Sequence, residues 1–99
     1  MEKLKPTHDL EAFKRAFARE RPMTYTAART ARSLGYNENA VANLLAGLRR
    51  SDFVKSMTSF ADHKQWQDVY HIDDGLGPIY LKFTDEVLTE FVLLSFKRK

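Results

Sequence analysis

Four polar side chains in the second half of the chain have types that can cleave RNA without a metal ion: Lys55, Gln67, Tyr80 and Lys97. Such cleavage uses the ribose 2′-hydroxyl as the nucleophile and passes through a phosphorane with extra negative charge, which fixed ammonium groups stabilise. A tyrosine or lysine can transfer a proton. An amide can hold a phosphate or a base edge in line. One interpretation of these residues is therefore a metal-independent ribonuclease site.

The segments that carry these residues have the two-residue period of β-strands. In residues 53–58 the alternation places Phe53, Lys55 and Met57 on one side of a strand. A second strand is expected from Trp66 to Ile72, with Gln67 pointing away from the Trp66 ring. A third is expected over residues 79–84, where Ile79, Leu81 and Phe83 face one way and Tyr80, Lys82 and Thr84 the other.

A last strand is expected within residues 87–97, where Val92, Leu94 and Phe96 share a side and Lys97 points away from them. The turn before it begins at Asp85 and Glu86. Together the alternations predict that Lys55, Gln67, Tyr80, Lys82 and Lys97 share one exposed surface.

The first half of the chain has helical periodicity. A first helix is expected after Thr7, as its N-cap, and before Arg21 and Pro22. A second runs from about Thr26 to Leu34, with Gly35 placed to end it. A third follows Asn37 and carries the apolar stripe Val41, Leu44, Leu45 and Leu48. The expected fold class is α+β: an antiparallel sheet of about four or more strands with three N-terminal helices packed against it, in one domain over residues 1–99.

Composition restricts the alternatives. The chain has 99 residues, a net charge of +3 and no cysteine, so disulfides and thiolate zinc sites are excluded. The three histidines have no metal-ligand spacing, and no cofactor is expected. We expect no membrane span and no secretory signal, and hence a cytoplasmic protein. A mildly basic chain permits a polyanionic partner without requiring one.

Each candidate also has a purely structural interpretation. An outward lysine on a strand keeps a sheet edge soluble, and Tyr80 is compatible with cross-strand packing. Trp66 suits a core position better than a base-stacking platform. His63 is a secondary candidate for RNA contact or proton transfer if residues 61–65 form a loop. Two rival functions therefore remain: a non-catalytic RNA-binding or ribosome-associated module, and a protein-interaction domain.

The segment SDFVKSMTSFADHKQWQDVY at residues 51–70 resembles the signature of the MqsR family of bacterial type II toxins. YLKFT at 80–84 and LLSFKRK at 93–99 continue the resemblance in the same order. It implies a fold similar to RelE and YoeB, and an mRNA interferase that needs no metal and cuts mostly at GCU. By motif, it implies functional roles for four residues, namely Lys55, Gln67, Tyr80 and Lys97.

In these roles Lys55 and Lys97 stabilise phosphate and phosphorane charge, Tyr80 transfers a proton, and Gln67 positions phosphate or base. Arg98, which makes the C-terminus more basic than the family pattern, joins Lys82 and His63 as a secondary RNA-binding candidate. The acidic turn between the last two strands is longer than the family spacing, which leaves the GCU preference less secure than the reaction type.

The resemblance further implies a partner. MqsR toxins are encoded with MqsA antitoxins, which combine a zinc-binding N-terminal domain with a helix-turn-helix domain. Neither feature is present in this chain, so zinc binding and operator DNA binding are expected to belong to the antitoxin.

Overall fold

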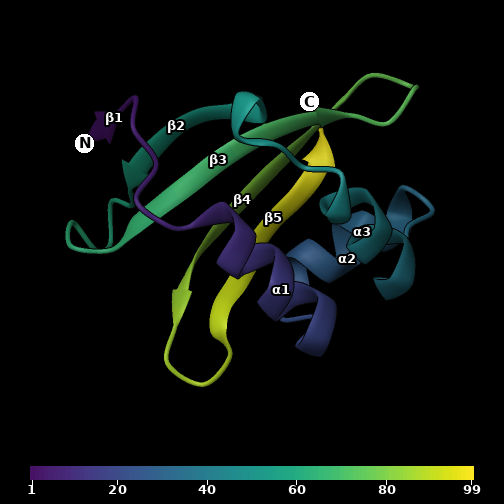
Figure 1. Ribbon diagram of the computed structural model, residues 1–99, viewed down its shortest axis with the longest axis horizontal. Helices are drawn as coiled ribbons and strands as arrows, with labels where there is room; N and C mark the ends of the chain where they lie inside the picture. Colours follow the sequence, from purple (N-terminus) through teal and green to yellow (C-terminus); the bar gives the residue numbers. More distant parts are fainter.

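A five-stranded antiparallel sheet forms the framework of the protein, and three helices pack against one of its faces (Figure 1). The computed structural model describes residues 1–99. The helices are α1 (Leu10–Glu20), α2 (Tyr25–Ser33) and α3 (Glu38–Ala46), and a short 3₁₀ turn, η1 (Arg50–Asp52), leads into the sheet. The strands are β1 (Glu2–Lys3), β2 (Phe53–Thr58), β3 (Trp66–Asp73), β4 (Pro78–Glu86) and β5 (Glu90–Arg98). The α+β class expected from the sequence is confirmed. None of the helices is long and apolar enough to cross a membrane.

Each helix begins at a side chain that accepts a hydrogen bond from the first turn. Asp9, Thr24 and Asn37 are the three N-caps, and they accept from the backbone N–H groups of Ala12, Ala27 and Ala40. The cap predicted at Asn37 is confirmed. The cap predicted at Thr7 is wrong, because Asp9 takes that role two residues later. Thr7 is instead bonded to the sheet, with its Oγ1 2.7 Å from Ser56 Oγ.

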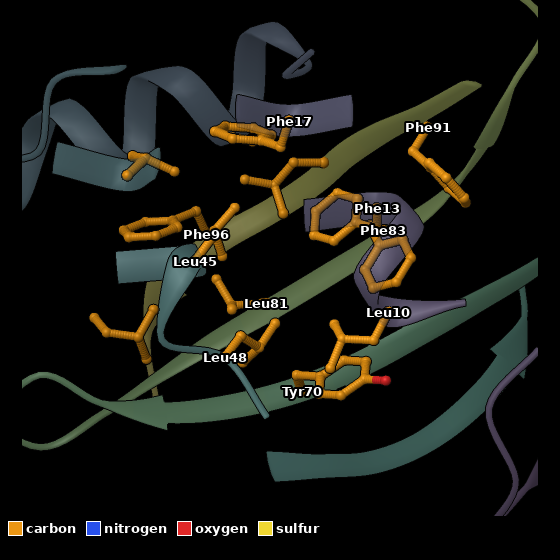
Figure 2. Close-up of a cluster of buried hydrophobic side chains, with 14 of the residues drawn as sticks. Leu10, Phe13, Phe17, Leu45, Leu48, Tyr70, Leu81, Phe83, Phe91 and Phe96 are labelled. Atoms are coloured by element: carbon orange, nitrogen blue, oxygen red, sulfur yellow. The ribbon is translucent and has the colours of Figure 1, made fainter. Parts of the chain in front are cut away.

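The core lies between the helices and the sheet, and aromatic rings fill much of it (Figure 2). Phe13 of α1 stacks on Phe83 of β4, with ring centroids 3.8 Å apart and planes 2° from parallel. Of the stripe predicted on α3, Val41, Leu45 and Leu48 are fully buried here. Such burial contributes roughly 1.5–3 kcal/mol per large apolar side chain. This packing fixes which face of the sheet is covered by helices.

The strands follow one another in chain order across the sheet, from β1 to β5. No sequence pattern predicted β1, a two-residue strand that pairs Glu2 with Met57 and Lys3 with Ser56 of β2. Asp68 anchors the chain that follows β1: its buried carboxylate accepts backbone hydrogen bonds from Thr7 and His8 at 2.8–3.1 Å. The N-terminus is therefore bound to the sheet edge beside β2 (Figure 1).

Irregularities in two strands overturn part of the predicted alternation. The register shifts between Phe53 and Lys55, so Phe53 lies on the helix face against the Tyr70 ring and does not share the side of Lys55. A second shift, between β4 and β5, pairs Leu93 with Phe83 and Phe96 with Leu81. The core residues of β5 are therefore Phe91, Leu93 and Phe96, rather than the Val92, Leu94 and Phe96 row. Such bulges insert one residue and shift the alternation on one strand only.

Candidate active site

The sheet face opposite the helices brings together most of the residues singled out from the sequence. We call it the open face, and define it by Lys55, Gln67, His71, Tyr80, Lys82 and Lys97. Tyr80 pairs directly with Lys97 across β4 and β5. In the adjacent row, Val69 lies between Lys55 on β2 and Lys82 on β4. Met57 pairs with Gln67 further along the sheet. The four primary candidates therefore lie on one face, on four neighbouring strands.

The Tyr80 ring lies between His71 and Lys97 in one row of this group. Lys97 Nζ is 5.0 Å from the ring centroid, within the range of a cation–π contact. Burial raises the pKa of the Tyr80 phenol, and Glu2 raises it further, whereas the positive charge of Lys55 lowers it. Burial is the largest of these effects, so the phenol keeps its proton near neutral pH. Tyr80 is thus available as a proton donor next to the Lys97 ammonium.

Lys55 reaches the same region from β2, where Glu2 holds its side chain. The ammonium Nζ donates to Glu2 Oε2 at 2.8 Å. This hydrogen bond raises the pKa of Lys55 and lowers that of Glu2, so both groups are charged at neutral pH. Glu2 reaches Lys55 because β1 pairs with β2. A strand of two residues is too short to show an alternation in the sequence, so this contact could not be predicted. An anion that approached Lys55 would compete with the Glu2 carboxylate.

Lys82 differs from Lys55 in its surroundings. It is half-buried in the middle of the open face, opposite Ser95 of β5 and Val69 of β3. Burial lowers the pKa of its ammonium, and the nearby charge of Lys97 lowers it further. The two cations are thus close enough to repel each other. An anion placed between such groups relieves that repulsion.

Gln67 is buried with one polar atom left unpaired. The residue is 8% exposed, and no donor of the chain reaches its Oε1. A buried amide oxygen without a partner costs about 1–3 kcal/mol, so such atoms commonly serve a ligand or a water. The unpaired Oε1 is covered by the chain, so Gln67 can accept from a hydroxyl or base N–H at this face once its side chain turns outward.

His71 also belongs to the open face, although it was not among the residues predicted from the sequence. It pairs with Tyr80 across β3 and β4, and the two ring centroids are 5.7 Å apart. Burial lowers the pKa of its imidazole, with a further contribution from Lys99. The signal was available in the alternation, since His71 follows Gln67 by four residues on the same strand.

Two secondary candidates lie away from this group. His63 is in the connection between β2 and β3, confirming the loop considered for residues 61–65, and lines a shallow hollow with Met1 and Phe60. Arg98 lies on the helix face, opposite to Lys97. It forms a two-pronged ion pair with Asp74, with N–O distances of 2.8 and 3.2 Å. The geometry therefore assigns Arg98 to the β3–β4 turn rather than to the open face.

Trp66 is partly buried, and its ring is covered by Lys3, whose Nζ lies 4.2 Å from the ring centroid. No group of three or more His, Cys, Asp and Glu side chains could hold a metal ion.

The open face itself combines three ammonium groups, a phenol, an imidazole and an unpaired amide oxygen. These groups can bind a phosphodiester and move protons around it.

Comparison with known proteins accords with this chemistry. A family model described as "Motility quorum-sensing regulator, toxin of MqsA" matches residues 5–98. The mRNA interferase toxin MqsR of Escherichia coli (strain K12) is 42% identical over 76 residues, which cover 77% of this chain and 76% of the relative. The family model matches every residue of the helices and nearly every residue of the sheet. The chain therefore belongs to the MqsR toxin family.

Proposed function

We propose that the open face is the site at which this toxin cleaves messenger RNA. Membership of the family gives the chain the role of a toxin with an antitoxin partner and an mRNA substrate, and its relative is named an mRNA interferase. The observation that carries the proposal is the Tyr80–Lys97 pair, a protonated phenol beside a cation, with Lys55 and Lys82 on the neighbouring row. These two neighbouring rows offer three positive side chains and one phenol to a single scissile phosphate.

In this proposal the 2′-oxygen of the ribose attacks phosphorus, and the bond from phosphorus to the 5′-oxygen breaks. Lys55 and Lys97 stabilise the added negative charge of the phosphorane. This interaction is stronger in the transition state than in the bound substrate, so it accelerates the reaction. Tyr80 gives its proton to the departing 5′-oxygen. The products are one fragment with a 2′,3′-cyclic phosphate and one with a 5′-hydroxyl.

Gln67 and Lys82 then have binding roles. The Gln67 side chain turns toward the substrate, and its unpaired Oε1 accepts a hydrogen bond from a ribose hydroxyl or a base N–H. Such a bond satisfies a buried atom that the folded chain leaves alone, so its gain is larger than that of an exposed contact. Lys82 lies between Val69 and Ser95 and neutralises a neighbouring phosphate. Binding of this kind is strongly salt-dependent.

The cleavage sequence, the compartment and the antitoxin are part of the same proposal. We propose cleavage at GCU-like sites, in the cytoplasm, where messenger RNA is translated. The antitoxin is proposed to be MqsA-like, with a zinc-binding domain and a helix-turn-helix domain. Contact with operator DNA would then be made by the antitoxin rather than by the toxin.

The experiment that tests this function is RNA-end mapping with the purified toxin. A defined RNA is incubated with the protein in the presence of EDTA, and both new ends are sequenced. The proposal expects cleavage that EDTA does not abolish, with 2′,3′-cyclic phosphate and 5′-hydroxyl ends. Intact RNA together with salt-dependent binding would support the rival, a non-catalytic RNA-binding module. No binding above background would support a protein-interaction domain.

A further inference from the structure

His71 is the one imidazole on the open face, and Tyr80 separates it from Lys97. The three residues form a continuous row across β3, β4 and β5, since His71 pairs with Tyr80 and Tyr80 pairs with Lys97. The imidazole and phenol rings are tilted by 47° with centroids 5.7 Å apart. A scissile phosphate bound over Tyr80 thus has an imidazole on one side and an ammonium on the other.

We propose that His71 is the general base of the cleavage reaction and removes the proton from the attacking 2′-hydroxyl. This inference rests on the function proposed above for the same face. It divides the two proton transfers between two adjacent rings. His71 accepts a proton where the nucleophile forms, and Tyr80 donates one where the leaving group departs.

The proton balance of this step is complete without a further reactant. The 2′-hydroxyl gives its proton to an imidazole nitrogen as the 2′-oxygen–phosphorus bond forms. The phosphorus–5′-oxygen bond breaks, and the 5′-oxygen takes the Tyr80 proton. After the products leave, imidazolium and phenolate return to their starting forms through solvent. The imidazolium and the phenolate exist only during turnover. Lys97, whose Nζ is 5.0 Å from the Tyr80 ring centroid, is then close to the negative charge of the phenolate.

The other groups of the open face are poorer bases. Lys55 is held as an ammonium by Glu2, which raises its pKa. Glu2 is a weak base, because the hydrogen bond from Lys55 lowers its pKa. The pKa of Lys82 is lowered by burial, but from an ordinary value of 10.5, whereas that of His71 is lowered by burial from 6.5. His71 is therefore the group that is neutral and basic at physiological pH.

The charged groups around His71 favour this neutral form. Tyr80 faces it from β4 and is uncharged. Lys99, which follows β5, lowers the pKa of the imidazole, and Lys97 lies beyond the Tyr80 ring. On the side of β2, Lys55 is opposite Val69, two residues along β3. Asp73, two residues further on β3, accepts hydrogen bonds from the backbone of Gly75 and Gly77.

The first test compares wild type with His71→Gln over a range of pH. For wild type, kcat/KM should rise with pH as His71 loses its proton, with a midpoint below 6.5, the ordinary value for histidine. His71→Gln should lose about 10²–10⁴-fold in kcat and lack this acidic limb. The RNA Kd should change little, since a neutral side chain replaces a neutral one. Added imidazole should restore activity to His71→Ala but not to His71→Gln, which fills the space.

The second test separates base from acid with an RNA whose bridging 5′-oxygen is replaced by sulfur. A thiolate leaves without protonation, so Tyr80→Phe should recover most of its rate on this substrate. His71→Gln should remain impaired, because the 2′-hydroxyl still has to lose its proton. Recovery of His71→Gln on the sulfur substrate would assign His71 the role of acid and overturn the proposal.

Failure of this inference differs from failure of the proposed function. If wild-type protein leaves RNA intact, the open face is not a nuclease site. If wild type cleaves RNA and His71→Gln cleaves it at the same rate with the same acidic limb, only the assignment of His71 fails. A melting temperature close to that of wild type shows that His71→Gln is folded. If it is not, the pH profile of wild type and imidazole rescue of His71→Ala still decide the question.

Discussion

Lys97 and Tyr80 lie directly opposite each other on β5 and β4, with the ammonium 5.0 Å from the centre of the phenol ring. The contact uses the ring face, and leaves the phenol oxygen at the ring edge free for another partner. The same tyrosine can therefore position a cation with its ring and donate a proton with its hydroxyl. These two functions are separable by mutation.

Tyr80→Phe keeps the ring and removes the proton. We expect kcat to fall by about 10²–10⁴-fold while RNA affinity is nearly unchanged, because the lost interaction forms only during reaction. Tyr80→Ala should lose affinity as well, since Lys97 then has no ring to pack on. Single-turnover cleavage and filter binding measure the two quantities. Equal cleavage by Tyr80→Phe and wild type would remove Tyr80 from the mechanism.

Lys55 and Lys5 form a matched pair of lysines, one on the open face and one in the exposed segment after β1. Lys55→Ala should reduce cleavage by roughly 10²–10³-fold, the usual cost of losing one group that stabilises transition-state charge. Lys5→Ala removes the same formal charge and should leave cleavage nearly unchanged. If both variants lose activity equally, net charge rather than a fixed phosphate contact explains the effect.

Replacement of Glu2 should have the opposite effect, because its carboxylate accepts a hydrogen bond from the Lys55 ammonium. Glu2→Gln removes a negative charge that a bound phosphate must displace. We expect RNA to bind a few-fold more tightly at low salt, with an affinity that falls more steeply as salt increases. Binding isotherms at several salt concentrations measure this. Weaker binding by Glu2→Gln would show that the ion pair positions Lys55 rather than competing for it.

The α+β class follows from the two kinds of periodicity, and several positions follow with it. The capping residue Asn37, the buried residues of β4 and the surface shared by Lys55, Tyr80 and Lys97 agree with the pattern of the sequence. All three depend on local sequence. The cap depends on the residue that precedes the helix, and the strand positions follow because a strand alternates its faces whatever its partner is. Tyr80 and Lys82 are placed on the open face by their neighbours in sequence alone.

What the sequence did not predict depends on contacts between distant segments. β1 is recognised only by its pairing with β2, and it brings Glu2 to Lys55 across 53 residues of chain. The bulge that turns Phe53 toward the helices places its ring against that of Tyr70 on β3. Alternation on β5 places Arg98 on the face opposite to Lys97, but its ion-pair partner there, Asp74, is 24 residues away in the chain. Local pattern contains none of these three partners.

The core gives a prediction about stability from two phenylalanines. Phe83 is fully buried and stacks on Phe13, whereas Phe60 is fully exposed between β2 and β3. Phe83→Ala should lower the free energy of unfolding by about 3–5 kcal/mol, from lost burial and the cavity that remains. Phe60→Ala should change it by no more than about 0.5 kcal/mol. Urea unfolding of both variants measures the difference, and a similar loss for both would contradict the packing described.

The ion pair between Arg98 and Asp74 gives a prediction about pH. Asp74 accepts from both Arg98 nitrogens, and also from the Tyr36 hydroxyl at 2.6 Å and the backbone N–H of Leu76 at 3.0 Å. These partners, Arg98 first, hold the pKa of the Asp74 carboxyl well below its ordinary value. A carboxyl with a lowered pKa in the folded state stabilises the protein above its unfolded pKa of about 3.9, and this contribution is lost as pH falls through the folded value.

Asp74→Asn should therefore lower the melting temperature at pH 7, and the difference from wild type should shrink as pH decreases below about 4. Asp85→Asn is a suitable control, since Asp85 is exposed at the far end of β4 and accepts only from the neighbouring Thr84 hydroxyl. RNA cleavage by folded Asp74→Asn should be retained, because Asp74 lies on the helix face with Arg98. A difference between Asp74→Asn and wild type that stays constant from pH 7 to pH 2 would mean that the carboxylate charge does not stabilise this turn.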